Sequence, residues 1–288
     1  MAGLAANLSA HETLFGRGPR TMWKGGFELE METMFEQSKR FYEGDNTVAN
    51  PDNMRMYEAT WSPGITYGVT RDFAVKAEFP FMYGVMTGES MGRHSLLSIG
   101  NWEVGAAYRI DPLIFGGPLV FEGGSCQLRL FGKAELPTAP ERENGISFGE
   151  ETFTFLGGGA IAIGTARHYF WGEVSGDIST EKDGTGMGPA LQSHAAYAWR
   201  IQELKDYREL DIILLFELDV EARSKGTMNG DDDPDSGHFT TYLGSGVQVN
   251  FTNLISLKTG YNVPLYRRYN GVQLADDGTF MLMFSYLF

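Results

Sequence analysis

The stretch FMLMFSYLF, residues 280–288, ends the chain with a regular alternation of side chains. Every second position carries a large apolar side chain: Phe280, Leu282, Phe284, Tyr286 and Phe288. Because successive side chains of a strand point to opposite faces, these five share one face. The stretch predicts a β-strand with one wholly apolar face, which suits a membrane barrel or the last strand of a soluble two-sheet sandwich.

Two further segments alternate in the same way and favour the barrel. In residues 212–223, apolar side chains such as Phe216 and Leu218 alternate with charged ones, and residues 27–35 repeat the pattern. Both segments exceed the ~5 to 6 residues of an ordinary strand and approach the ~9 to 11 of a tilted membrane strand. Their length separates the two folds, because alternation alone fits both.

The same alternation predicts about twelve strands along the chain. They lie near residues 22–37, 53–68, 72–87, 97–111, 123–137, 150–165, 168–181, 190–202, 210–226, 238–251, 254–268 and 278–288. An even number of strands can close an antiparallel sheet without leaving an edge, as a bilayer requires.

The predicted connections differ at the two ends of the strands. Most connectors at one end are short, as at 70–72 and 166–167, although 111–124 is longer and apolar. The other end has polar loops near 38–52, 88–96, 138–149, 182–189, 227–237 and 269–277. This asymmetry predicts an all-β fold: a closed antiparallel transmembrane barrel with short periplasmic turns, long extracellular loops and both termini in the periplasm.

Composition restricts the function. The mean hydropathy is -0.22, and no apolar run approaches the ~18 residues of a membrane helix. The 37 Asp and Glu against 23 Lys and Arg give a net charge of -14, which disfavours nucleic acid as a partner. With one cysteine, Cys126, and five scattered histidines, the sequence predicts no disulfide, no metal and no cofactor.

If the apolar side chains face lipid, the alternating charged ones face a lumen, where acids outnumber bases. The predicted lumen-lining and transport residues are Glu28, Glu30, Glu32, Glu78, Glu103, Arg129, Lys133, Glu135, His194, Arg200, Glu217, Asp219, Glu221 and Lys258. About twelve strands enclose either a narrow conduit or a polar plug. Glu217, Asp219 and Glu221 occupy successive inner positions of 212–223. Because they carry the same charge, they cannot neutralise one another.

Catalysis is not expected, because the histidines lack the partner that a barrel lipase needs. Such an enzyme places a His and a Ser two residues apart on one face, and no histidine here has a serine at that spacing. Ser193 and His194 are adjacent and point to opposite faces of a strand. An outer-membrane lipase is therefore the third hypothesis.

The first residues lack the basic and apolar regions of an export signal. We expect a processed or artificial terminus, a domain of residues 21–288 that forms the barrel, and a segment of residues 1–20 that is a periplasmic tail or a lumen plug. Arg17 and Arg20 of that segment could pair with lumen acids.

Four short motifs resemble an outer-membrane family. They are Glu135-Leu136-Pro137-Thr138, Gly18-Pro19-Arg20-Thr21, Glu78-Phe79-Pro80 and Asn262-Val263-Pro264. Together they are similar to the outer-membrane transporters associated with meta-pathway phenol degradation, although Ala139 stands where that family commonly has Gly. The resemblance implies small monomeric barrels that pass small, often apolar or aromatic molecules, and it implies no catalytic residue.

These observations predict a channel of the bacterial outer membrane for passive uptake or efflux of small molecules. Its expected partners are outer-membrane lipid, lipopolysaccharide, the solute, and the barrel-assembly machinery, because the strand that ends at Phe288 resembles the strand which that machinery recognises. The alternative is a non-catalytic barrel that docks a periplasmic partner, such as a cytochrome or a metal-resistance component, through the apolar connector at 113–121.

Overall fold

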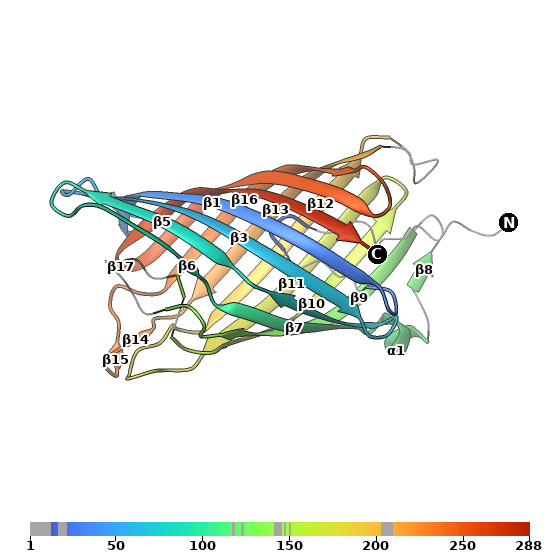
Figure 1. The fold of residues 1–288 in the computed structure, drawn as a ribbon, viewed down its shortest axis with the longest axis horizontal. Helices are drawn as coiled ribbons and strands as arrows, with labels where there is room; N and C mark the ends of the chain where they lie inside the picture. The colour runs from blue at the N-terminus through green and yellow to red at the C-terminus, as the bar shows by residue number, and fades with distance from the viewer. Residues whose placement is uncertain are drawn as a thin grey trace.

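The computed structural model describes residues 13–16, 22–116, 119–121, 124–140, 146, 148–149, 151–202 and 210–288. Arg17, Arg20 and the connector 203–208 lie outside the described residues, as does most of the predicted segment 1–20. In the described part, antiparallel strands wind into a closed barrel (Figure 1). The predicted fold class is therefore confirmed.

Eleven strands close the ring. In chain order they are β1 (Phe27–Gly44), β3 (Arg55–Gly68), β4 (Phe73–Glu78), β7 (Trp102–Arg109), β9 (Gly124–Leu136), β10 (Thr154–Thr165), β11 (His168–Ser179), β12 (Ala190–Arg200), β13 (Asp211–Arg223), β16 (His238–Asn250) and β17 (Ile255–Leu287). Each pairs with its neighbours, and β1 closes the ring by pairing with both β3 and β17.

β17 crosses the wall twice. Its first half pairs with β16 from Ser256 to Tyr269, and its second half pairs with β1 up to Leu287. The chain reverses near Gly271, where φ is +61°, a conformation that glycine adopts without steric cost. Because β17 crosses the wall twice, the chain crosses the wall about as many times as the twelve strands that the sequence predicts.

The remaining elements extend or decorate the wall. They are β2 (Asn46–Val48), β5 (Phe81–Gly88), β6 (Gly92–Ile99), α1 (Asp111–Phe115), β8 (Leu119–Phe121), β14 (Thr227–Met228) and β15 (Asp231–Asp232). β5 and β6 prolong β4 and β7 after short interruptions, since β5 pairs with β3 beyond the end of β4. Among the described residues, no helix is long and apolar enough to cross a membrane.

Three predicted loops are wrong in part. Residues 38–44, 92–96 and 272–277 belong to strands β1, β6 and β17. The polar residues in these segments indicated loops, but the strands continue as hairpins whose tight turns use Gly44, Gly92 and Gly271, all with positive φ. Hydrophobic alternation marks only the part of a strand that faces lipid, so a polar extension of the same strand escapes it.

The two faces of the wall have opposite chemistry. Leu29, Phe216, Leu218 and Phe284 are among the apolar side chains that are 40% or more exposed on the outside. Charged side chains such as Glu217, which is 2% exposed, point inward. Apolar groups on the outside and ionised groups on the inside are what a barrel in lipid requires.

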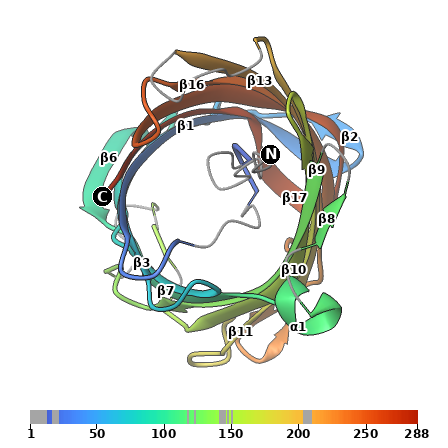
Figure 2. The ribbon, with the colours of Figure 1, turned by 90° about the vertical axis from the view of Figure 1, so that its right-hand side faces the viewer.

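The ends of the strands also differ. The turns at Val69–Asp72, 166–167 and 251–254 lie at the end that carries the C-terminus and α1 (Figure 1). The connection 224–237, with β14 and β15, lies at the opposite end. The connector 111–124, which the sequence left as an apolar stretch, contains α1 and β8 on the outside of the wall (Figure 2).

This arrangement makes a testable prediction about sidedness. Single cysteines at Asp232 and Asn253, placed in a Cys126→Ser background, are expected to react with an impermeant maleimide from opposite sides of the outer membrane. Asp232 should label in whole cells, whereas Asn253 should label only after the membrane is opened. Labelling of both residues in whole cells would contradict the predicted orientation.

Candidate functional site in the barrel lumen

A short stretch near the N-terminus lies inside the barrel. Figure 2, which looks into the barrel from the end that carries the C-terminus, shows residues 13–16 within the ring of strands. The backbone N–H groups of Leu14 and Phe15 donate hydrogen bonds to the Glu217 carboxylate at 2.5 and 2.9 Å. Hydrogen bonds to a buried charged acceptor are stronger than those between neutral groups. Glu217 therefore anchors this stretch to β13.

Apolar contacts reinforce the anchor. Leu14 is 2% exposed and belongs to a cluster of inward-facing side chains. The other members are Ala162, Tyr169, Trp171, Ala196, Ala198, Ile213, Leu215, Met281 and Met283, with Phe15 and Met34 against them. A Cβ at Gly246 or Gly260 would lie 2.3 or 2.6 Å from Leu14 Cδ1. These two glycines face each other in β16 and β17, and their lack of side chains makes room for the leucine.

The lumen holds two cavities. The larger, of about 560 Å³, is lined among others by Thr13, Leu14, Phe15 and Gly16. The smaller, of about 190 Å³, is lined by Phe15, Gly16 and residues of β11, β12, β13, β16 and β17. Since Phe15 and Gly16 line both cavities, the anchored stretch borders each of them inside the barrel.

The larger cavity is acidic. Of the described residues that line it, eight are glutamates: Glu28, Glu30, Glu32, Glu36, Glu58, Glu78, Glu103 and Glu135. The cationic residues that line it are Lys76, Arg129 and Lys133. The Lys76 ammonium lies 2.6 Å from Glu30 and 3.1 Å from Glu78, and Lys133 lies 2.6 Å from Glu103. In the described part of the chain, Glu32 and Glu58 have no such cation within 4 Å, so the cavity keeps an excess of carboxylates.

The predicted lumen-lining residues fall into three places. Glu28, Glu30, Glu32, Glu78, Glu103, Arg129, Lys133 and Glu135 line the larger cavity. His194, Asp219 and Glu221 line the smaller one, beside Glu217. Arg200 and Lys258 line neither cavity: Arg200 pairs with Asp211 at 3.0 Å near the end of the barrel that carries α1, and Lys258 is 4% exposed in β17.

The three successive acids of β13 have partners on other strands. Glu217 accepts the two backbone hydrogen bonds and lies 3.0 Å from His194 Nε2. Glu221 lies 3.1 Å from Arg223 and 3.3 Å from His238. Asp219 is the least compensated, with its Oδ1 3.7 Å from His194 Nε2. The three acids cannot neutralise one another; their partners are Arg223 on the same strand and His194 and His238 on the neighbouring strands β12 and β16.

Sequence reasoning missed the apolar layer of the lumen and one of its acids. The run Ile212-Ile213-Leu214-Leu215-Phe216 is apolar at every position, which is the pattern of a strand with apolar surroundings on both faces. That signal could have placed Ile213 and Leu215 in the lumen. Glu36 continues the alternation of Glu28, Glu30 and Glu32, so the same rule could have found it.

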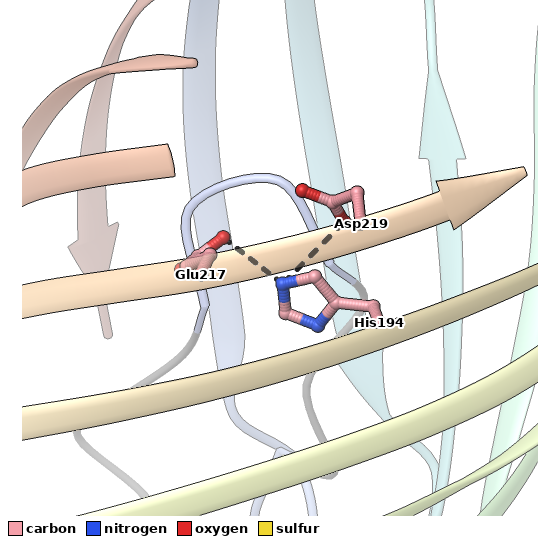
Figure 3. Close-up of side chains that lie close together, drawn as sticks. All are labelled: His194, Glu217 and Asp219. Carbon is pink, nitrogen blue, oxygen red and sulfur yellow. Dashed lines mark hydrogen bonds and ion pairs between the residues drawn. The ribbon is translucent and has the colours of Figure 1, made fainter. Parts of the chain in front are cut away.

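His194, Glu217 and Asp219 converge on one point of the wall (Figure 3). The three come from neighbouring strands β12 and β13, where His194 faces Asp219 directly in the strand register. The imidazole Nε2 points toward both carboxylates (Figure 3). The His194 and Glu217 side chains are 6% and 0% exposed. Sequence spacing could not predict this group, because its geometry depends on the pairing of the two strands.

Solved structures of outer-membrane proteins resemble this fold, whereas no protein-family model and no curated protein matches the chain. The COG4313 outer membrane channel from Pseudomonas putida F1 aligns with a TM-score of 0.74 and 12% identity, over 93% of this chain and 97% of that one. The beta domain of the Bordetella autotransporter BrkA aligns with a TM-score of 0.48 and 12% identity, over 92% and 100% of the two chains.

Three observations indicate a membrane barrel. They are the similarity to the COG4313 channel, the closed wall and the apolar outer face of that wall. A similarity at 12% identity over nearly the whole of both chains is a similarity of fold. The closed antiparallel ring satisfies every condition for a chain that spans lipid with strands. The chain is accordingly a β-barrel of the bacterial outer membrane, and it shares its architecture with an outer-membrane channel.

Proposed function

We propose that the protein is an outer-membrane channel for small molecules, and that residues 13–16 restrict its lumen. The observation that carries this proposal is the acidic cavity of about 560 Å³, one wall of which is the anchored stretch. Among the described residues that line this cavity, acidic side chains outnumber basic ones, as a selective lumen requires. The fold shared with an outer-membrane channel supports the same reading.

The cargo proposed for this channel is a small molecule with an apolar or aromatic part. This proposal rests on the family resemblance of the sequence and on the apolar layer of the lumen, where Tyr169, Trp171 and Met281 surround Leu14. The apolar layer borders the acidic cavity, because Leu14, Met281 and Met283 belong to the layer and also line that cavity. Such a lumen suits amphipathic molecules, because each part of the solute finds groups of its own polarity.

The channel is expected to prefer cations. An excess of carboxylates in a narrow, low-dielectric lumen raises the local concentration of cations. In planar bilayers with a KCl gradient, the reversal potential should indicate a preference for K⁺, and the preference should weaken at ~1 M salt, where the Debye length falls to about 3 Å. The triple change Glu32→Gln, Glu36→Gln and Glu58→Gln should move the reversal potential toward zero.

A matched control uses acids outside the lumen. Replacing Asp231, Asp232 and Asp233 by Asn removes the same number of charges from an exposed connection. Bulk water screens these groups, so the reversal potential should change much less. Equal shifts for the two triple variants would place the selectivity outside the cavity, and absence of any conductance or solute flux would defeat the channel proposal.

We propose no catalytic role for the lumen. His194 is the inward-facing histidine beside the anchored stretch, and it faces two carboxylates instead of a hydroxyl group. Its neighbour Ser193 is exposed on the opposite face of β12. This geometry disfavours the lipase hypothesis. Hydrolysis of a phospholipid by the purified barrel would contradict this proposal.

One observation favours docking as a second candidate function. Leu113, Ile114 and Phe115 of α1 are 70%, 58% and 50% exposed on the outside of the wall (Figure 2). Such a group of apolar side chains at one end of the barrel can contact a periplasmic partner or the membrane interface. Stoichiometric copurification of a partner that is lost in a Leu113→Glu, Ile114→Glu variant would support docking.

A further inference from the structure

We infer that His194, Glu217 and Asp219 form a binding site for one divalent transition-metal ion, of which Zn²⁺ is the best example. The inference goes beyond the proposed channel, since metal binding can be measured without any transport. The ligand atoms are His194 Nε2, Glu217 Oε2 and Asp219 Oδ1, on strands β12 and β13.

The distances between these atoms fit one ion. Nε2 lies 3.0 Å from Glu217 Oε2 and 3.7 Å from Asp219 Oδ1, and one potential ligand atom of each of the three residues lies within 4.8 Å of the other two. Zn²⁺ binds nitrogen and oxygen ligands at about 2.0 to 2.2 Å, which places adjacent ligand atoms roughly 3 to 3.6 Å apart. An ion can therefore bind without a large movement of the three side chains.

The site is also short of positive charge, and one carboxylate oxygen of Asp219 lacks a hydrogen bond from any described residue. A single imidazole faces two carboxylates, and in the described part of the chain no Lys or Arg lies within 4 Å of Glu217 or Asp219. Asp219 Oδ2 is buried and lacks a hydrogen-bond partner among the described residues. The Asp219 side chain is only 24% exposed. Removing a carboxylate oxygen from water without a partner is costly, and a divalent cation bound to Asp219 and Glu217 would offset that cost.

A second histidine–carboxylate pair, His238 and Glu221, does not lack positive charge. His238 and Glu221 also lie on adjacent strands, with His238 Nε2 3.3 Å from Glu221 Oε1. There the Arg223 guanidinium lies 3.1 Å from Glu221 and 3.0 Å from Asp177. Because an arginine already supplies the positive charge, the His238 group is a control for the site at His194.

The ligand set determines the class of metal. A neutral imidazole nitrogen with two carboxylates suits Zn²⁺ and similar first-row ions, whereas Ca²⁺ and Mg²⁺ prefer oxygen ligands alone. The three protein ligands leave coordination positions for water. The cavity of about 190 Å³, which His194 and Asp219 line, provides space for that water.

The site shares Glu217 with the anchored stretch. Glu217 Oε2 accepts the hydrogen bond from the Phe15 N–H and is also the proposed metal ligand. A carboxylate oxygen that coordinates a cation has less negative charge to offer a second donor. Zn²⁺ in this site would consequently weaken the hydrogen bond from the Phe15 N–H to Glu217 that anchors residues 13–16.

The test uses the full chain without a histidine tag, purified in detergent and treated with a chelator. Titration with Zn²⁺ in a calorimeter should give one ion bound per barrel, and Co²⁺ should give a visible d–d absorption band. His194→Gln and, separately, Asp219→Asn should abolish both signals, while His238→Gln should leave both unchanged. Far-UV circular dichroism verifies that each variant is folded.

Three results would overturn the inference. The first is absence of stoichiometric Zn²⁺ binding to the folded wild-type barrel. The second is binding that the His194→Gln variant retains, which would place the ion elsewhere. The third is Ca²⁺ binding as tight as that of Zn²⁺, because a site of that kind would consist of carboxylates without the imidazole.

Discussion

Deletion of residues 2–16 is expected to increase the single-channel conductance of the barrel severalfold. These residues include Leu14 and Phe15, which donate hydrogen bonds to Glu217, and Phe15 and Gly16 line both lumen cavities. Their removal joins the cavities into one path, and the apolar layer loses Leu14 from its centre. Single-channel recordings of the wild type and the deletion variant in planar bilayers measure the difference.

A point substitution should reproduce part of this effect. Glu217→Gln replaces one of the two acceptor oxygens by an NH₂ group that faces a backbone donor, so the anchor loses one of its two hydrogen bonds and all of its charge. Its conductance should fall between those of the wild type and the deletion variant. Glu221→Gln, two positions further along β13, does not contact the stretch and should not open the pore. Unchanged conductance after the deletion would show that residues 13–16 do not restrict the path.

Arginine at Leu218 is expected to destabilise the barrel by about 2 to 4 kcal/mol if that residue lies at the middle of the bilayer. Leu218 is 40% exposed on the outer face and stands near the centre of β13. A guanidinium at this place must lose its hydration in lipid. Equilibrium unfolding by urea in lipid vesicles gives the free energy of unfolding for each variant.

The next residue along the strand is the matched comparison. Asp219→Arg places the same side chain on the opposite face, where Glu173 lines the smaller lumen cavity and Glu217 lies close by. The cost should be much smaller, because the guanidinium remains solvated and faces carboxylates. Equal losses of stability for the two variants would mean that the inside and outside of β13 have been interchanged.

The sequence by itself determined the class of fold, because the information lies in a local period. Phe280, Leu282, Phe284 and Tyr286 alternate with smaller or polar residues over a length that suits a bilayer, and each strand repeats that rule without reference to its neighbours. The same local rule assigned Glu217 and Asp219 to the lumen and Leu218 to the lipid. It failed at 38–44 and 272–277, where polar residues indicated loops but strands β1 and β17 continue.

Only the tertiary structure decided which lumen groups meet. The hydrogen bond from Leu14 to Glu217 joins residues 203 positions apart, and no periodicity within a strand can encode such a contact. The pairing of His194 with Asp219 depends on the register between β12 and β13, which a shift by one residue would abolish. Closure of the ring fixes that register, and it also creates the space in which Leu14 packs against Gly246 and Gly260. The alternation therefore determines which side chains face inward. The closed sheet determines which of them are in contact, because contacts depend on distance in space and not on distance along the chain.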